Sequence, residues 1–237
     1  MAGTIFQDSA TSLKLWFYAM YLMASTRCGI SAKQLERELG VTYKCAWRIF
    51  HKIRSMLDES GDGPQLSGKV EIDESLYGGK KENKHRNKRS KHPHMVKTTV
   101  MGLVEREGRV QAKVLTMPWS GQMLPPIKEH VLPGTMIFTD EAQIYHNNIR
   151  RMGFQHRRVN HSQKVYVSGD VHTNTIEGFW SLTKNGIRGV YHNVSAKYLQ
   201  MYLDEYAFRY NRRKSLGRRN MFDAFAKRIK KRVSASA

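Results

Sequence analysis

Cysteines and long apolar runs are scarce in this sequence of 237 residues, and each scarcity excludes a class of protein. The only cysteines, Cys28 and Cys45, are too few for a disulfide framework and too far apart for a Cys-x-x-Cys metal knuckle. No apolar run approaches the roughly 20 residues that span a bilayer, and the N-terminus lacks a signal-peptide pattern. The sequence therefore predicts a cytoplasmic protein that has no membrane partner.

Acidic residues are also few, because 20 Asp+Glu stand against 40 Lys+Arg and give a formal charge of +20. Such a chain would repel itself without a polyanionic partner, and nucleic acid is the obvious one. Ribosomal and histone-like proteins are equally basic, so charge alone does not separate an enzyme on nucleic acid from a passive binder. The hydrophobic content of 40% is ample for folded cores.

The N-terminal segment has the pattern of three helices. Residues 11–26 are densely apolar without Gly or Pro, which predicts one mostly buried helix. Ser31-Ala-Lys-Gln34 matches a capping box that begins a short helix, and Gly40 supplies its C-cap. Thr42 can cap a following helix over residues 43–57. This succession is a helix-turn-helix pattern.

The last of these helices is predicted to be apolar on one side and basic on the other. Its inward positions are Ala46, Ile49, Ile53 and Leu57, and its largely outward positions are Lys44, Arg48, Lys52 and Arg54. The functional interpretation places this helix in a major groove, with its basic side on phosphates. The alternative is a helical hairpin that only packs. The two caps and the basic helix favour DNA contact through Lys44, Arg48 and Lys52.

The rest of the chain follows a linker and alternates strands with helices. Strands are predicted over residues 70–73, 98–104, 110–117, 135–139 and 156–159, and helices over 123–130, 144–152, 175–187 and 196–210. Three antiparallel strands followed by alternating elements are compatible with a ribonuclease-H-like α/β fold. The predicted divisions are a helical region 1–60, a linker 61–69, a mixed-sheet catalytic domain 70–213 and a basic C-terminal helix and tail 214–237.

Three acidic residues stand out against the basic background: Asp73, Asp140 and Glu177. Asp73 and Asp140 are predicted to end strands and Glu177 to open a helix, which are places where α/β folds collect ligands. Phosphodiester cleavage needs charge neutralisation that two Mg²⁺ ions about 4 Å apart provide from oxygen ligands. Each residue also has a purely structural interpretation, such as a capping box between Asn174 and Glu177.

Four ordered motifs make the pattern more specific. They are Val-Glu-Ile-Asp73-Glu-Ser-Leu-Tyr-Gly-Gly-Lys, Phe-Thr-Asp140-Glu, His172-Thr-Asn174-Thr-Ile-Glu177-Gly-Phe-Trp180-Ser and Phe208-Arg-Tyr-Asn211-Arg. Together they resemble the DDE transposases of bacterial insertion sequences related to the Merlin superfamily, from about Gly3 to Arg213. The resemblance implies that the three acidic residues are a catalytic triad that binds two Mg²⁺ ions, with Mn²⁺ able to substitute.

The resemblance also implies roles for residues near the triad. The family's basic residue seven positions after the glutamate becomes Lys184, two helical turns from Glu177 and on the same face, where it could hold a terminal phosphate or base. His172 and Asn174 match family positions and could orient the scissile phosphate, although helix capping explains Asn174 equally well. Glu74 and Glu141 directly follow the aspartates, and strand alternation is expected to point them away.

One feature departs from the family pattern. Members commonly carry an N-terminal zinc ribbon before the helix-turn-helix, and this chain begins at Gly-Thr-Ile-Phe without the necessary cysteines. Either that element is short or the chain is truncated. Recognition of DNA ends is then expected to rest more heavily on the helix-turn-helix and on other DNA-binding factors.

Two further segments are strongly basic. The insert 80–92, with Lys80, Lys81 and Arg86, is too polar to bury and is predicted to clamp DNA or to remain a solvated loop. The C-terminal basic region contributes Arg212 and Arg213 as DNA-binding candidates. The aromatics interleaved there, Tyr206, Phe208 and Tyr210, fit a core better than base-stacking platforms.

The sequence thus predicts a DDE transposase that binds double-stranded DNA at element ends and at the target. It would cleave and join DNA as a homodimer or higher oligomer, because inverted ends require at least two copies. Its expected location is the bacterial cytoplasm, in association with the nucleoid. Two alternatives remain: a structure-selective nuclease with the same triad but no strand transfer, and a non-catalytic helix-turn-helix regulator.

Overall fold

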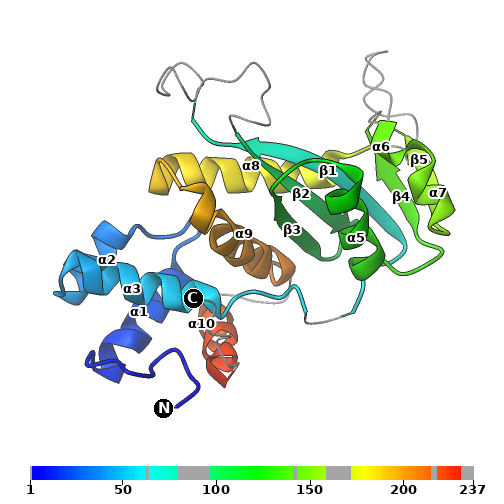
Figure 1. Ribbon diagram of the computed structural model, residues 1–237. Coiled ribbons are helices and arrows are strands. Elements are labelled where there is room, and N and C mark those ends of the chain that lie inside the picture. The colour runs from blue at the N-terminus through cyan, green and yellow to red at the C-terminus, as the bar shows by residue number, and fades with distance from the viewer. Residues whose placement is uncertain are drawn as a thin grey trace.

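A five-stranded mixed sheet with helices on both faces lies beside a group of helices from the two ends of the chain (Figure 1). The computed structural model describes residues 2–61, 64–79, 97–140, 143–158, 172–214 and 218–230. N-terminal helices followed by a mixed sheet confirm the predicted fold class. None of the helices in these ranges has the length and apolarity to cross a membrane.

The N-terminal helices lie where the sequence predicts, although the first begins at Leu13 and not at residue 11, and the third ends at Ser55 and not at Leu57. They are α1 (Leu13–Ser25), α2 (Ala32–Leu39) and α3 (Tyr43–Ser55). The Ser31 hydroxyl accepts a hydrogen bond from the Gln34 amide, and Gly40 ends α2 with a φ of 63° that favours glycine. The Thr42 hydroxyl accepts from the Cys45 amide in the same way. The predicted helix-turn-helix is therefore present.

The prediction that Arg54 points outward is wrong. Its side chain is fully buried, and its Nε donates a hydrogen bond of 2.7 Å to Oε2 of Glu205. The guanidinium also lies 3.6 Å from the ring centroids of Phe50 and Tyr202. A basic residue on an amphipathic helix normally faces water. Here the partner that makes burial tolerable comes from a helix 151 residues further along the chain.

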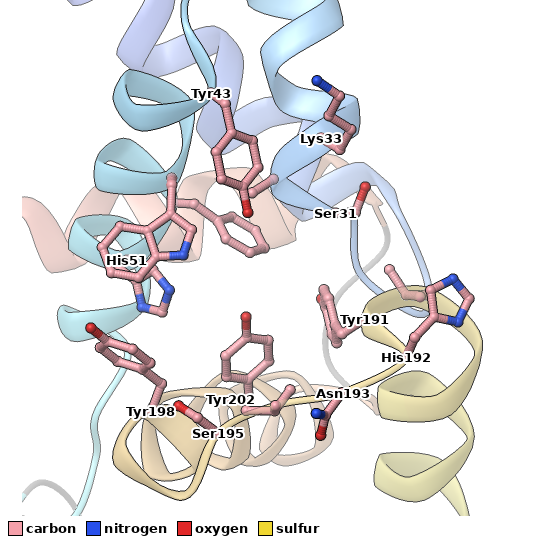
Figure 2. A pocket seen from close by; sticks show the side chains of 15 residues that line it. Ser31, Lys33, Tyr43, His51, Tyr191, His192, Asn193, Ser195, Tyr198 and Tyr202 are labelled. Carbon is pink, nitrogen blue, oxygen red and sulfur yellow. The ribbon is translucent and has the colours of Figure 1, made fainter.

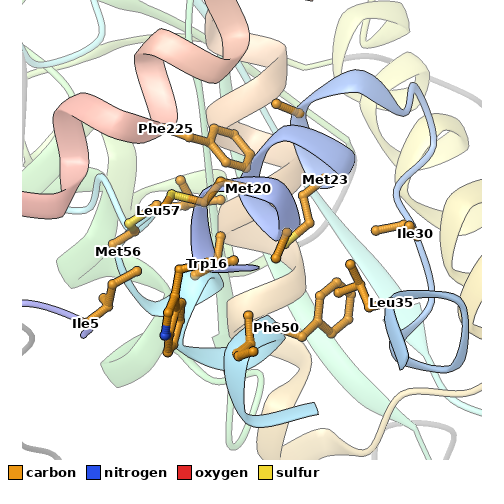
Figure 3. Packing of buried hydrophobic residues seen from close by; sticks show 14 of the residues in the cluster. Ile5, Trp16, Met20, Met23, Ile30, Leu35, Phe50, Met56, Leu57 and Phe225 are labelled. Atoms are coloured by element: carbon orange, nitrogen blue, oxygen red, sulfur yellow. The ribbon is translucent and has the colours of Figure 1, made fainter. Parts of the chain in front are cut away.

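The helical group shares one core with the C-terminal part of the chain. Helix α10 (Arg218–Lys227), followed by a 3₁₀ turn (Arg228–Lys230), packs against α1. Figure 3 shows Phe225 lying over Met20 within this core, which also includes Trp16 and Phe208. The core predicted for Tyr206 and Phe208 is confirmed, since both side chains are buried.

The sheet has the strand order β3-β2-β1-β4-β5. Its strands are β1 (Lys69–Tyr77), β2 (Thr98–Glu105), β3 (Val110–Leu115), β4 (Met136–Thr139) and β5 (Gln155–Arg158). Strand β2 pairs antiparallel with both β1 and β3, as predicted, whereas β4 pairs in parallel with both β1 and β5. Strand β1 continues four residues beyond Asp73, so the prediction that Asp73 ends this strand is wrong.

Each face of the sheet has its own core. One face packs against α5 (Ser120–His130), α6 (Gln143–His146) and α7 (Asn148–Arg151). The opposite face packs against α8 (Asn174–Gly186), its π-helical extension (Ile187–Tyr191) and α9 (Ala196–Asn211). Helix α5 runs through Pro125 and Pro126 without interruption, and the single helix predicted over residues 144–152 is divided into two short ones.

The predicted domain boundaries stay a prediction, but the linker segment 61–69 has some structure of its own. Leu66 is buried and forms an isolated parallel bridge with Val131, and Lys69 is the first residue of β1. Leu66 and Lys69 therefore attach the described end of this segment to the residue that follows α5 and to the sheet.

Candidate metal centre and nucleic-acid interface

Asp73 and Asp140 come together at the centre of the sheet. Strands β1 and β4 are parallel, and their last paired residues are Ile72 and Thr139. Asp73 and Asp140 directly follow these two residues, so they lie side by side at the carboxyl end of β4. The sequence predicted this convergence, and the parallel register is its physical cause.

Glu74 completes an acidic group with these two aspartates. Carboxylate oxygens of Asp73, Glu74 and Asp140 all lie within 4.8 Å of one another. The sequence predicted that strand alternation would keep Glu74 out of the site, and this prediction is wrong. Alternation does send Glu74 to the opposite face, where its carboxylate accepts a hydrogen bond from Tyr145 of α6. Because β4 ends at Thr139, it does not extend alongside Glu74, and the two faces of β1 meet at this edge while β2 still pairs on the other side.

The electrostatics of the acidic group suit a bound cation. Burial, together with the nearby charges of Asp140 and Glu177 and against opposing hydrogen bonds, raises the pKa of Asp73 to about 6. Burial, together with Asp73 and Asp140, raises the pKa of Glu74 to about 8. Three half-buried carboxylates with converging oxygens are the donor set that Mg²⁺ or Mn²⁺ prefers. The residues present therefore fit a divalent metal.

Trp180 of α8 holds the Asp73 carboxylate in place. Its indole Nε1–H donates a hydrogen bond of 2.9 Å to Oδ2 of Asp73. The ring lies against Gly102 of β2, the residue paired with Asp73, and a Cβ at that glycine would come 2.6 Å from Cζ2 of Trp180. Glycine at this position thus allows the indole to reach the carboxylate.

Glu177 lies in the first turn of α8, near the acidic group but outside it. Its charge contributes to the raised pKa of Asp73, yet its carboxylate is not among the oxygens that converge within 4.8 Å. The side chain is exposed, and Oε1 accepts a hydrogen bond from the Thr173 hydroxyl. The N-cap of α8 is Thr173 and not Asn174, so the capping box considered between Asn174 and Glu177 lacks its first residue.

A buried glutamate that the sequence analysis did not single out anchors α8 to the sheet. Glu71 accepts hydrogen bonds from the amides of Thr175 and Ile176 at the start of the helix, and from the Thr175 hydroxyl. It is also paired with Arg106, at 2.7 Å from Nε to Oε1. Glu71 and Asp73 are two residues apart in β1, so both side chains face α8. Acidic residues two positions apart in a predicted strand lie on the same face, and this spacing from Asp73 could have identified Glu71 in the sequence.

His172 and Asn174 precede Glu177 without joining the acidic group. Nδ1 of His172 lies 3.3 Å from Oε1 of Glu71, and its carbonyl accepts a hydrogen bond from Arg106. Asn174 is exposed as the first residue of α8. Their predicted auxiliary roles remain predictions.

Lys184 lies on α8 where the spacing from Glu177 places it. Its Nζ is 5.9 Å from the centroid of the Tyr77 ring, and the side chain is half-buried. Burial lowers the pKa of this lysine, Arg188 and Lys97 lower it further, and Asp73 opposes them. The influence of Asp73 indicates that the ammonium group lies near this aspartate, on the α8 side of the sheet.

The other DNA-binding candidates lie on several surfaces. Lys44 is exposed on α3, whereas Arg48 donates to Ser9, and Nζ of Lys52 lies 3.5 Å from the Gln7 carbonyl. Arg212 is paired with Glu59 at 2.6 Å, and Arg213 donates to the Gly108 carbonyl, so both guanidinium groups make intramolecular contacts. Lys80, Lys81, Arg86 and Glu141 lie outside the described residues.

Comparison with known proteins agrees with this geometry. Residues 65–211 match the family described as ISXO2-like transposase domain. The chain is 29% identical over 217 residues to an uncharacterized protein in transposable element ISH50 of Halobacterium salinarum, which covers 84% of this chain and 71% of that protein. It is 27% identical over 103 residues to an uncharacterized transposase-like protein of Haemophilus influenzae, covering 44% of this chain and 81% of the relative.

Two solved structures show weaker likeness. A chain of the simian T-cell lymphotropic virus intasome in complex with PP2A regulatory subunit B56 gamma aligns with a TM-score of 0.37 and 14% identity. That alignment covers 81% of this chain and 65% of the other, just under two thirds of its length. A chain of a pre-cleavage Mos1 transpososome aligns with a TM-score of 0.33 and 11% identity, over 85% of this chain and 74% of that one.

Proposed function

Because the chain belongs to the ISXO2-like transposase domain family, we propose that it is a DDE-type transposase acting on the ends of its own insertion sequence. In this proposal it binds the element ends, hydrolyses a phosphodiester bond there, and joins the freed 3′-hydroxyl to target DNA. The partners are double-stranded DNA and at least one further copy of the chain, because two inverted ends must be held together.

The observation that carries this proposal is the meeting of Asp73 and Asp140 where the parallel pairing of β1 and β4 ends, inside the matched region. A passive DNA-binding protein gains nothing from half-buried carboxylates that would repel phosphates. Carboxylates with raised pKa values in an otherwise basic chain are typical of a site built for chemistry.

Asp73 and Asp140 would hold Mg²⁺, with Glu74 or Glu177 as a further ligand. When bound, the ions supply charge neutralisation on the attacking and leaving oxygens of the phosphodiester. Glu177 is exposed in the first turn of α8, and exposed side chains change rotamer within nanoseconds. Turning away from the Thr173 hydroxyl would bring its carboxylate toward Asp73, which already experiences its charge.

Residues of the chain supply the other functions. Trp180 fixes the Asp73 carboxylate, and Glu71 fixes the start of the helix that carries Glu177. Lys184, on the same face of α8, would hold a phosphate of the terminal nucleotide as a point charge. In the first step a P–O bond forms to water as the bond to the 3′ oxygen breaks. In the second the freed 3′ oxygen forms a bond to a target phosphorus as the bond from that phosphorus to its original 3′ oxygen breaks, and the target strand leaves with a 3′-hydroxyl that takes up the proton.

The test uses labelled DNA that carries the element ends, with Mg²⁺ or Mn²⁺. Joined products support the transposase, cut ends without joining identify a nuclease, and binding without cutting identifies a regulator. Asp73→Asn is expected to abolish cleavage and spare DNA binding, while Asp223→Asn on the exposed face of α10 serves as the control. Cleavage at the wild-type rate by Asp73→Asn would show that the acidic group is not the catalytic centre.

The role of Lys184 is tested separately. Lys184→Ala is expected to lower end cleavage, whereas Lys128→Ala removes an exposed lysine from α5, on the opposite face of the sheet, and should have no effect. Wild-type cleavage and affinity in Lys184→Ala would remove its proposed role without touching that of the carboxylates.

A further inference from the structure

A cavity of about 450 Å³ lies between the helix-turn-helix and the segment that joins α8 to α9. Figure 2 shows Tyr43 and His51 on one wall and Tyr191, Tyr198 and Tyr202 on the facing wall. None of the acidic residues of the candidate metal centre lines it. Its volume falls within the range of about 300–1,000 Å³ that is usual for sites of small organic groups.

The cavity is lined by aromatic rings that contact one another. Trp47 lies 4.1 Å from His51 and 5.3 Å from Tyr198, measured between ring centroids. Tyr191 and Tyr202 form a second pair at 4.8 Å, and His51 lies 6.1 Å from Tyr202 between the two groups. These pairs meet tilted or edge to face, at interplanar angles of 46°, 81°, 75° and 72°, so the walls present both ring faces and ring edges, which suits a flat aromatic occupant.

Polar groups at the edge of the cavity suit an occupant with hydrogen-bonding edges. Figure 2 shows the hydroxyls of Tyr43 and Tyr202 pointing into the space from opposite walls, with Ser31, Ser195 and Asn193 around it. Amide and hydroxyl groups both donate and accept, so they can satisfy the mixed edge of a nucleobase. An aliphatic side chain would leave these groups without partners.

The lining of the cavity carries no negative charge that would exclude a group attached to phosphates. No Asp or Glu is among its fifteen lining residues, which include Lys33, His51 and His192. The buried guanidinium of Arg54 lies behind the wall, 3.6 Å from the Tyr202 ring centroid. Burial and, to a smaller extent, the charge of Arg54 lower the pKa of His51 to about 4, so the imidazole remains a neutral ring near pH 7. Arg54 is paired with Glu205 and Lys33 with Glu36, and no carboxylate lines the cavity, so its lining does not repel a group attached to phosphates.

The cavity lies along the expected path of DNA. One wall belongs to α3, the predicted groove-binding helix, and the other begins at the C-terminal end of the helix that carries Glu177 and Lys184. Tyr191 is fourteen positions after Glu177, which corresponds to roughly 20 Å along a helix. A DNA strand that reaches both α3 and the acidic group would pass this opening.

We propose that this aromatic cavity binds one unpaired nucleobase of DNA held between the helix-turn-helix and the catalytic core. The inference rests on the DNA-binding part of the proposed function and adds a site to it. Every base has a π-face, so stacking among these rings would be tolerant of sequence. Lys33 and the basic residues of α3 would stay on the phosphates outside.

The test compares two duplexes that differ only by one extrahelical adenine, without divalent metal so that no strand is cut. Wild-type protein is expected to bind the duplex with the extra base on the order of ten-fold more tightly, as measured by fluorescence anisotropy. With 2-aminopurine in place of that adenine, fluorescence should be quenched on binding. Tyr43→Ala and Tyr198→Ala should lose both effects and keep their affinity for the paired duplex.

Two variants make the test specific. Tyr198→Phe retains the stacking ring and should keep the preference. Tyr18→Ala removes a tyrosine of α1 whose exposure, 40%, is close to the 49% of Tyr43. This variant should also keep the preference for the duplex with the extra base. Equal affinity of wild type for both duplexes, or an unchanged preference in Tyr43→Ala and Tyr198→Ala, overturns the nucleobase site alone. A change of oligomeric state in those variants without loss of base preference also overturns it. Binding to neither duplex overturns the DNA-binding proposal as well.

Discussion

The indole of Trp180 donates its only N–H to the carboxylate of Asp73, across 2.9 Å and 107 residues of chain. This bond joins the helix that carries Glu177 to the strand that carries the first acidic residue. It also favours the ionised form of Asp73, whose pKa burial raises to about 6. A residue that the sequence marks only as apolar thus orients a metal-ligand candidate.

Trp180→Phe is expected to weaken divalent-metal binding by on the order of ten-fold, because outer partners of metal ligands have effects of this size. The aromatic volume remains, so the fold should be kept. The measurement is Mn²⁺ titration followed by calorimetry. Trp119→Phe, at a tryptophan that is 59% exposed, is the control. Equal Mn²⁺ affinity in both variants would show that the indole bond has no role in the site.

Gly102→Ala is expected to destabilise the protein by about 1–3 kcal/mol, because its Cβ would clash with Trp180 and with Ile176 at 2.7 Å. Gly178→Ala is the matched control. No atom lies within 4 Å of that Cβ, and alanine favours a helix interior by up to about 1 kcal/mol. Urea unfolding measures both. A neutral Gly102→Ala would mean that the contact with Trp180 relaxes without cost.

Glu71→Gln is expected to lower the free energy of unfolding by about 3 kcal/mol or more, since it removes the buried negative charge that pairs with Arg106. The start of α8 also loses a charged acceptor for two amides. Glu107→Gln alters a glutamate side chain that is 90% exposed and should stay within about 0.5 kcal/mol of wild type. Denaturant unfolding would contradict the anchoring role if the two variants were equally stable.

His51 gives the protein a component of acid sensitivity. Its folded-state pKa of about 4 lies below the ordinary 6.5, so the unfolded chain takes up the proton first as the pH falls. Stability is then lost between about pH 6.5 and pH 4, at up to about 1.4 kcal/mol per pH unit. The difference in unfolding free energy between wild type and His51→Gln should follow this slope, while the exposed His192→Gln should match wild type. A pH-independent difference would contradict the shift.

Local signals in the sequence predicted much of the fold. The Ser31 and Thr42 caps and the Gly40 turn act over three or four residues, so the residues themselves fix where α2 and α3 begin and end. Apolar runs located the strands to within a few residues. The order of Asp73, Asp140 and Glu177, with the motifs around them, was enough to indicate the family.

Long-range contacts were not visible in the same way. The burial of Arg54 depends on Glu205, the anchoring of α8 on Glu71, and the position of Glu74 on the early end of β4. Each partner is distant in sequence, and amphipathic or alternating patterns describe only one element at a time.

The sequence by itself determined the charge, the order of the helices and strands and the acidic residues at the sheet, because these follow from composition and short-range patterns. Only the tertiary structure decided which carboxylates meet, which arginine is buried and where aromatic rings enclose a cavity. Those outcomes depend on how α3, α8 and α9 pack, and packing brings together residues that no local pattern relates.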